Sequence, residues 1–505
     1  MSVLRRLTPL LLAPAAFVIS AANAESPKMK MTTPVPPGIA TPDTLDTPIG
    51  TLKLFDGVPD EATTRKVYDN LDLQRGVQAY LNSIQIASMY GMRKGILDFG
   101  PANTTALLFE TLMDSKALWL TPNTVSVYMT MWLEVKDEPM VIETPPNVLG
   151  IIDDHWFHYV ADFGNAGPDK GKGGRFLILP PGYKGDVPDG YQVARTNTYG
   201  NWLIWRGFQE NGDPKPAIDR TKTLFRVYPL SQKDNPPKMN FINVSGKFHN
   251  TIHRMDYGIF EEINEVVQAE PSEGQDPEIL GLLASIGIKK GQPFKPDARM
   301  KKILTQAADI GAATVRTLAA RPREDWFYYY PGESYWATPF VGGSYLFNDK
   351  NNARILDGRA MFHFYATGIT PAMTQAPIGK GSQYAMLYLD KDGKPLDGSK
   401  AYKVTLPKDV PAKDFWSFTL YGNQTRSMLQ TDQQFPGLDN NKKGLKQNKD
   451  GSYDVYFGPK PPKGKEANWI QTVPGKGWNM LFRLYGPLKP WFDKTWRPGD
   501  AVEAK

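Results

Sequence analysis

The spacing of apolar residues divides the chain into helical and strand-forming segments. Apolar side chains recur every three to four positions in four segments, which is the period of an amphipathic helix. The predicted helices cover residues 60–94, 256–269, 277–286 and 298–320. Asp276 and Pro277 strengthen the third prediction, because Asp is a favoured N-cap and Pro fits the first helical position.

The remaining pattern consists of short apolar and aromatic runs separated by turns rich in Gly and Pro. The first group of predicted strands covers residues 119–133, 140–143, 156–162, 175–179, 191–199 and 201–206. The second group covers residues 362–368, 383–389, 401–406, 415–421, 453–457 and 478–485. Short strands with turn signals at regular intervals indicate antiparallel β-sandwiches. We therefore predict a mainly β protein with two sandwiches and a helical segment between them.

The composition agrees with a folded protein that is rich in turns and sheets. The 505 residues include 45 Gly, 43 Pro and 12% aromatic residues, with 41% hydrophobic and 22% charged residues. These proportions exclude wholesale disorder. The chain has no Cys, which excludes disulfides, cysteine nucleophiles and thiolate metal sites. The 59 Lys and Arg are nearly balanced by 53 Asp and Glu and form no basic block, so nothing indicates nucleic acid binding.

The N-terminus has the three parts of a secretory signal peptide. Arg5 and Arg6 precede a mostly apolar run over residues 7–20, and Ala22-Asn23-Ala24 supplies a cleavage site. The alternative, a membrane anchor, is disfavoured because the run is short and contains Pro14. No later segment has 18 uncharged apolar residues, so we expect no stable membrane span after cleavage. A secreted protein without Cys is typical of the bacterial periplasm or medium.

Motifs in both strand-rich regions resemble two families that occur in tandem. Residues 381–384, 390–398, 413–421, 448–452, 468–470 and 482–487 resemble the DUF1214 family. That pattern includes an FWS-x-x-x-Y strand, a DGS hairpin, an NWL-like turn and an RLY-x-P strand. A second set of positions resembles the DUF1254 family: residues 121–124, 139–146 and 179–185, together with Tyr159, Asp162, Arg206 and the Gly212-Asp213 turn. The resemblance implies two jelly-roll-like sandwiches joined by helices, and little about activity, because both families are named for unknown function.

These observations together predict five segments. They are a signal peptide (1–24), a flexible leader (25–59), a helix with the first, DUF1254-like sandwich (60–245), a helical bridge (246–334) and the second, DUF1214-like sandwich (335–505).

His249, His253 and Asp256 are the candidate ligands of a divalent metal. A spacing of four residues places two imidazoles on one face of a helix, and Asp256 follows three residues later. The alternative is a capping or core polar role, since Asn250 stands where a zinc protease motif has Glu. His363 lies in a predicted strand among aromatic residues and is expected to be a core histidine.

An aromatic segment at residues 325–336 is the candidate ligand-binding surface. Trp326, Tyr328, Tyr330 and Trp336 combine apolar rings with polar tips, which suits an amphipathic or sugar-like ligand. The alternative is packing between domains.

Arginines in the second strand-rich region are candidate anchors for an anion. Arg354 lies near its start, and Arg483 lies between Phe482 and Leu484 in a predicted strand. If Arg483 faces inward it needs a partner, which could be a carboxylate of the protein or of a ligand.

We therefore expect the protein to be periplasmic. The first hypothesis is that it is an enzyme, metal-assisted or not, that acts on a small amphipathic or anionic substrate in an interdomain cleft. The second hypothesis is a non-catalytic ligand-binding or envelope structural protein. The chain has no Gly-x-Ser-x-Gly elbow and no P-loop, and its sequence specifies neither the reaction nor the oligomeric state.

Overall fold

The protein is mainly β, with antiparallel and mixed sheets and eight α-helices in its described part. A computed structural model describes residues 28–340, 343–375 and 377–504. The predicted signal peptide lies outside these residues. The chain divides into two compact units, with the boundary between Tyr68 and Asp69. Within the described residues, no helix combines the length and the apolar character that a membrane crossing requires.

The first unit contains a small antiparallel sheet. Its strands are β1 (Thr44–Thr47), β2 (Gly50–Phe55) and β3 (Val58–Pro59), in that order. This sheet occupies the second part of the segment that we expected to be a leader. Helix α1 (Glu61–Leu97) starts directly after it, and the Asp60 carboxylate accepts a hydrogen bond from Thr63 N at 2.7 Å.

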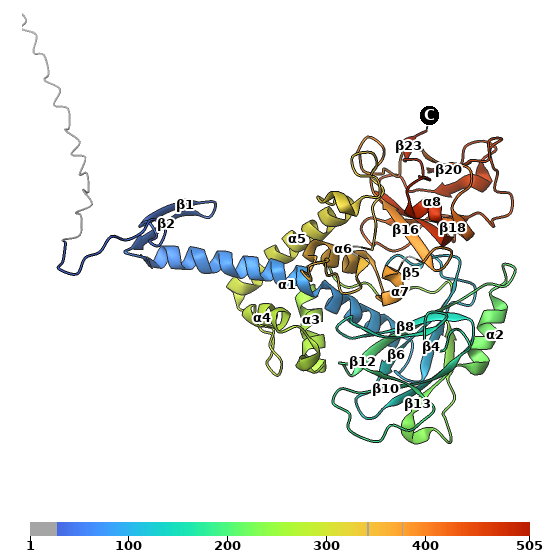
Figure 1. Ribbon diagram of the computed structural model, residues 1–505, viewed down its shortest axis with the longest axis horizontal. Helices are drawn as coiled ribbons and strands as arrows, with labels where there is room; N and C mark the ends of the chain where they lie inside the picture. Colours follow the sequence, from blue (N-terminus) through green and yellow to red (C-terminus); the bar gives the residue numbers. More distant parts are fainter. Residues whose placement is uncertain (1–27, 341–342, 376, 505) are drawn as a thin grey trace, which may run out of the picture. The chain divides into compact units, whose positions relative to one another are not determined.

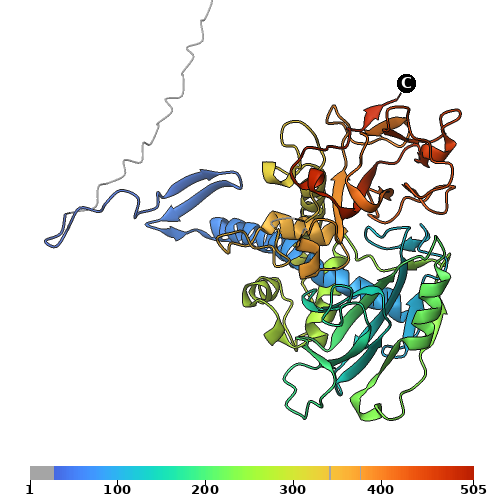
Figure 2. The ribbon, with the colours of Figure 1, turned by 45° about the vertical axis from the view of Figure 1, so that its right-hand side comes forward.

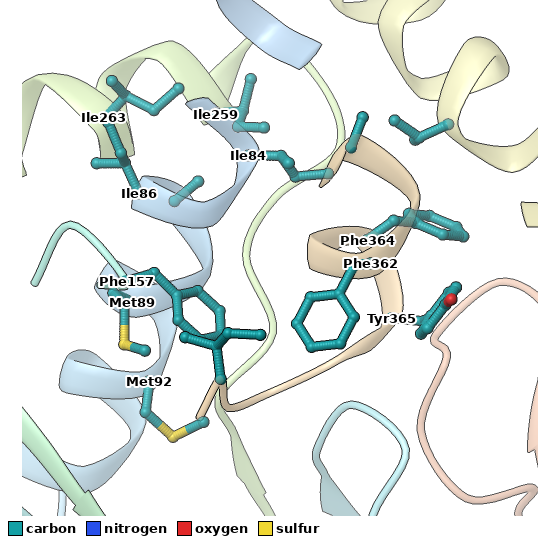
Figure 3. Packing of buried hydrophobic residues seen from close by; sticks show 14 of the residues in the cluster. Ile84, Ile86, Met89, Met92, Phe157, Ile259, Ile263, Phe362, Phe364 and Tyr365 are labelled. Atoms are coloured by element: carbon teal, nitrogen blue, oxygen red, sulfur yellow. The ribbon is translucent and has the colours of Figure 1, made fainter. Parts of the chain in front are cut away.

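Helix α1 and three later helices pack into one apolar core. Helices α3 (Gly258–Ala269), α4 (Pro277–Ser285) and α5 (Ala298–Ala320) lie within two residues of their predicted ranges. Asp276 and Asp297 cap α4 and α5. Figure 3 shows Ile84, Ile86 and Met89 of α1 beside Ile259 and Ile263 of α3. This helical core also packs on one face of the first large sheet, through Trp132, Trp202 and Ile204.

The first β region consists of two sheets that share a core. The six-stranded sheet has the order β14-β4-β6-β12-β8-β9, and the four-stranded sheet has the order β11-β10-β7-β13. The former contains β4 (Thr105–Leu108), β6 (Val127–Glu134), β8 (Val148–Asp154), β9 (Tyr159–Gly164), β12 (Gly200–Gly207) and β14 (Asn240–Asn243). The latter contains β7 (Met140–Thr144), β10 (Gly174–Leu179), β11 (Gln192–Arg195) and β13 (Arg226–Pro229). Helix α2 (Lys215–Leu224) packs on the shared core through Ala217 and Ile218.

The second β region repeats this plan with two four-stranded sheets. One sheet has the order β16-β22-β18-β19, from β16 (Ser382–Leu387), β22 (Trp478–Pro487), β18 (Ala412–Gly422) and β19 (Gly437–Asp439). The other has the order β21-β20-β17-β23, from β21 (Trp469–Gln471), β20 (Tyr453–Gly458), β17 (Tyr402–Leu406) and β23 (Val502–Glu503). Phe418, Val455, Phe457 and Phe482 belong to the core between them. In Figures 1 and 2 the strands of the two β regions form separate bodies, beside helices α5 and α6.

Two predicted strands have a different structure. Residues 362–368, predicted as a strand, belong mostly to helix α6 (Leu356–Tyr365), which is followed by the short helix α7 (Pro371–Thr374). Residues 358–365 are all buried, so apolar and polar positions do not alternate along them. Their sequence therefore has no periodicity by which a helix could be distinguished from a strand. The strand predicted over residues 119–133 is interrupted, because residues 119–126 form a loop that contains Thr121 at a φ of +43°.

Candidate functional site

Arg483 lies on the central strand β22 and is buried, with 3% of its surface exposed. Its neighbours Phe482 and Leu484 point into the second core, so the guanidinium lies on the opposite face of the sheet. Nη1 donates to Thr419 Oγ1 at 3.0 Å. Nη2 donates to Thr121 O at 3.0 Å and to Tyr421 OH at 2.6 Å. Arg483 therefore has neutral oxygens as partners and joins the two β regions.

Tyrosines surround this guanidinium. Tyr384 on β16 is paired directly with Arg483, whose Cζ lies 5.3 Å from the Tyr384 ring centroid and 5.7 Å from that of Tyr421. Tyr485 lies two residues along β22, on the same face as Arg483. The Tyr421 hydroxyl donates to Pro122 O, a second bond to the loop of the first β region.

A second arginine reaches the same place from the first β region. Arg206 on β12 is paired with Tyr128 on β6, and its guanidinium lies close enough to the Tyr384 phenol to help lower the pKa of that phenol. Its positive charge also acts on Tyr128 and Tyr485. The arginine–tyrosine cluster consists of Arg206, Arg483, Tyr128, Tyr384, Tyr421 and Tyr485. Arg206, Tyr384 and Tyr485 are partly exposed, whereas Arg483 and Tyr421 are buried.

The two arginines give the cluster a net positive charge. Neither Arg206 nor Arg483 forms an ion pair with Asp or Glu in the described residues. A guanidinium stays charged in proteins, so the charge cannot be removed by deprotonation. The arrangement therefore favours an anion at the exposed side of the cluster, where Arg206 lies.

The arginines also change the acidity of the tyrosines. Burial raises the pKa of the Tyr384 phenol, but the charges of Arg206 and Arg483 outweigh burial and hold that pKa below its ordinary value of 10. Burial raises the pKa of Tyr485, whose hydroxyl is buried and has no hydrogen-bond partner within the described residues. The cluster thus offers one phenol that loses its proton more readily and one that keeps it as a donor.

Strained backbone holds the loop that Arg483 contacts. Thr121 has a φ of +43°, and Arg426, which accepts from Thr121 N at 3.1 Å, has a φ of +62°. A β-branched residue in this region is an outlier, and such strain costs about 1–3 kcal/mol. The surrounding hydrogen bonds enforce this conformation, which directs the Thr121 carbonyl at Arg483.

The cluster draws on two segments that correspond to known families. The model described as "Protein of unknown function (DUF1254)" matches residues 103–229, and the model described as "Protein of unknown function (DUF1214)" matches residues 381–489. The chain carries DUF1254 and DUF1214 domains in tandem. Tyr128 and Arg206 belong to the DUF1254 domain, and Tyr384, Tyr421, Arg483 and Tyr485 belong to the DUF1214 domain. The predicted tandem arrangement is confirmed.

Two crystal structures match most of the chain at low sequence identity. The VPA0106 protein from Vibrio parahaemolyticus is 18% identical with a TM-score of 0.53, and the match covers 86% of this chain and 100% of that one. A putative uncharacterized protein from Burkholderia cenocepacia is 12% identical with a TM-score of 0.37, covering 88% and 97%. The first likeness shows a shared fold. No curated protein sequence matches the chain.

The structure does not bring the predicted metal ligands together. His249 lies in strand β15 (His249–Asn250) beside β5 (Ala117–Leu118), so the helix on which the metal hypothesis depended does not form there. Gly91 and Gly95 of α1 lie so close to this extended segment that an added Cβ would be 2.7 Å from Thr251 O and 2.3 Å from Asn250 O. If residues 249–253 were helical, their backbone could not keep these close contacts with the two glycines.

Each of the three candidate ligands also has another partner. His249 Nε2 accepts a hydrogen bond from Trp119 Nε1 at 2.6 Å, and burial lowers its pKa to about 4. His253 Nδ1 bonds Arg254 O, and burial and then Arg426 lower its pKa to about 3. Asp256 pairs with Arg254. Within the described ranges, no group of three or more His, Asp or Glu could hold a metal ion.

The predicted aromatic residues lie in packing positions. Trp336 is fully buried and donates to Gly499 O, and the Tyr330 hydroxyl donates to Trp496 O, both within the second β region. Tyr328 donates to Pro322 O. Trp326 is 45% exposed and stacks on Phe327. The polar tips of the three other residues are thus bonded to the protein's own carbonyls.

Of the candidate ligand residues, Arg483 alone belongs to the arginine–tyrosine cluster. Arg354 is exposed and donates to Leu346 O. Sequence reasoning did not select Arg206, Tyr128, Tyr384, Tyr421 or Tyr485. A signal was present, since Arg483 and Tyr485 are two residues apart, as are Thr419 and Tyr421, and such pairs share one face of a strand.

Two other buried polar groups serve packing. His155 Nδ1 bonds Glu270 Oε1 at 2.7 Å, and Glu270 also accepts from Tyr199 N at 2.6 Å. His363, at the end of α6 rather than in a strand, bonds Arg359 O, and burial lowers its pKa to about 3. Both histidines are buried, as expected of core residues.

Proposed function

We propose that this protein binds and chemically transforms a small anionic substrate at the arginine–tyrosine cluster. The observation that carries the proposal is the meeting of Arg206 and Arg483 among four tyrosines, with no ion-paired carboxylate in the described residues. Arginine recognises carboxylates, sulfonates and phosphate esters through paired N–H groups. We therefore infer a substrate that bears one of these groups.

The two arginines have different roles in this proposal. Arg483 has three protein oxygens within 3.0 Å and is a positioning residue, which fixes Tyr421 and the Thr121 loop. Arg206 is partly exposed and is the residue that contacts the substrate anion. The Tyr485 hydroxyl, which has no partner in the described residues, supplies a second donor.

Tyr384 is the residue that exchanges a proton with the substrate. Its phenol lies against Arg206, and both arginines favour its ionised form. A phenol with a lowered pKa accepts and returns a proton nearer to neutral pH than free tyrosine does. This arrangement suits acid–base chemistry on an anion, and it needs neither a metal nor a covalent nucleophile.

We also propose a periplasmic or extracellular location and jelly-roll-like sandwiches for both β regions. The location is supported by the signal-peptide pattern of residues 1–24. The sandwich form is supported by the pairs of sheets that share one core in each region.

A thermal-shift screen with small carboxylates, sulfonates and phosphate monoesters tests the proposal. We expect at least one class to raise the melting temperature of the wild type and of Arg175→Gln, but not of Arg206→Gln. Arg175 is a matched control, because it stacks on Tyr191 at 5.3 Å on strand β10, away from the cluster. An equal shift for Arg206→Gln, or no shift with any class, would contradict the proposal.

A further inference from the structure

A second pair of arginines lies outside the arginine–tyrosine cluster. Arg426 follows strand β18 and is 2% exposed, and Arg316 belongs to helix α5. Their Cζ atoms lie 4.7 Å and 5.5 Å from the ring centroid of Phe364, so both guanidiniums contact one aromatic ring. Figure 3 shows Phe364 on α6, among the apolar residues of the helical core.

Hydrogen bonds to neutral groups satisfy only some of the N–H donors of these two arginines. Arg426 Nη1 donates to Phe364 O at 3.0 Å and to Met255 Sδ at 3.2 Å. Its Nε is buried and has no hydrogen-bond partner among the described residues. Arg316 donates to the carbonyls of Asn423 and Gln424, at 2.6 and 3.2 Å.

Within the described residues, no acidic side chain forms an ion pair with either arginine of this pair. His253 Nε2 lies 3.4 Å from Arg426 Nη1, where a neutral imidazole accepts a hydrogen bond but supplies no negative charge. Burial and the like charge of Arg316 lower the pKa of Arg426 to about 10.

Two like charges at a buried ring are unfavourable without a counter-ion. Burying an unpaired charge costs several kcal/mol, and arginine does not lose its proton at neutral pH. The unsatisfied Nε gives an anion a specific donor on which to bind. Phe364 and Met255 both contact the Arg426 guanidinium, which favours a small anion such as a halide over a larger one.

We propose that a chloride-sized anion binds between Arg316 and Arg426 as a structural counter-ion. This site shares no residue with the arginine–tyrosine cluster and does not depend on the proposed function. It has one connection to that cluster, because Thr121 donates its N–H to Arg426 O and accepts from Arg483 through its own carbonyl. The bound anion would thus stabilise the loop that carries Thr121.

Thermal unfolding at constant ionic strength tests this site. We compare sodium chloride with sodium gluconate, whose anion is too large for the site. We expect a melting temperature about 1–3 °C higher in chloride for the wild type and for Arg321→Gln, and no difference for Arg316→Gln. Arg321 is the matched control, since it also donates to a backbone carbonyl, Gly393 O, at the end of α5. The same chloride effect in Arg316→Gln, or none in the wild type, would overturn the proposal.

Bromide gives a direct readout that needs no variant. In wild-type crystals grown with sodium bromide, we expect an anomalous peak within hydrogen-bond distance of Arg426 Nε. A well-ordered Arg426 without such a peak would also refute the site.

Discussion

At the scale of single residues, the proposed function depends on arginine charges that no nearby carboxylate neutralises in the described part of the chain. Arg206 and Arg483 have oxygens of Tyr, Thr and backbone groups around them, where most buried arginines have carboxylates. Because these oxygens are neutral, the positive charge of the two arginines can act on a bound ligand and on the tyrosines. The acidity of Tyr384 is therefore the residue property that most directly reports the cluster.

Tyr384→Phe should remove the first tyrosine to ionise when the pH is raised. The two arginines hold the pKa of Tyr384 below 10, whereas burial raises that of Tyr485, so the two phenols ionise in that order. Absorbance at 295 nm, followed from pH 7 to pH 11, measures tyrosinate. We expect the early phase to be lost in Tyr384→Phe and kept in Tyr485→Phe. An early phase that survives in Tyr384→Phe would show that the arginines do not act on this phenol.

Asp153 provides a second residue-scale prediction. Burial, followed by the charges of Asp154 and Asp162, raises its pKa well above 3.8, although Ile369 N donates to it at 3.0 Å. Folding then requires proton uptake above pH 3.8, so this group favours folding at low pH and opposes it as the pH rises.

Asp153→Asn should therefore lose less stability than the wild type between pH 4 and pH 8. Urea unfolding at both pH values measures the difference. Asp392→Asn, at an exposed residue in a turn, should follow the wild type. If Asp153→Asn and the wild type show the same pH dependence, Asp153 is ionised in the folded protein.

At the scale of elements, most helices and strands follow from their periodicity. Helices α3, α4 and α5 could be predicted because each has one apolar face and two have an Asp cap. Helix α6 could not, because residues 358–365 are buried all round. The extended conformation of residues 249–253 could also not be predicted from the sequence, because it depends on contacts with distant glycines of α1.

Gly95 in helix α1 should not tolerate a side chain. A Cβ at this position would lie 2.3 Å from Asn250 O, which is backbone and cannot rotate away. We expect Gly95→Ala to reduce the free energy of unfolding by about 1–3 kcal/mol. Gly281→Ala in α4 is the control, with no atom within 4 Å of its added Cβ, and should gain up to about 1 kcal/mol from helix propensity. Urea unfolding of both variants measures these changes, and a Gly95→Ala protein as stable as the wild type would contradict the close contact.

At the scale of the whole molecule, the cluster exists only because two β regions meet. Arg483 could be selected from sequence, since a charge within an apolar strand needs a partner. Its partners Thr121 and Pro122 precede it by more than 350 residues, and no local spacing indicates that contact. The candidate metal site failed for the related reason that a helical spacing was assumed where the chain is extended.

The central claim is that Arg206 binds the anionic group of a substrate between the DUF1254 and DUF1214 domains. The most direct test is calorimetric titration of the best anion from the screen into the wild type, Arg206→Gln and Arg175→Gln. Loss of one charged hydrogen-bonding partner should weaken binding roughly 10- to 150-fold in Arg206→Gln and leave Arg175→Gln unchanged. Equal affinity in all three proteins would contradict the claim.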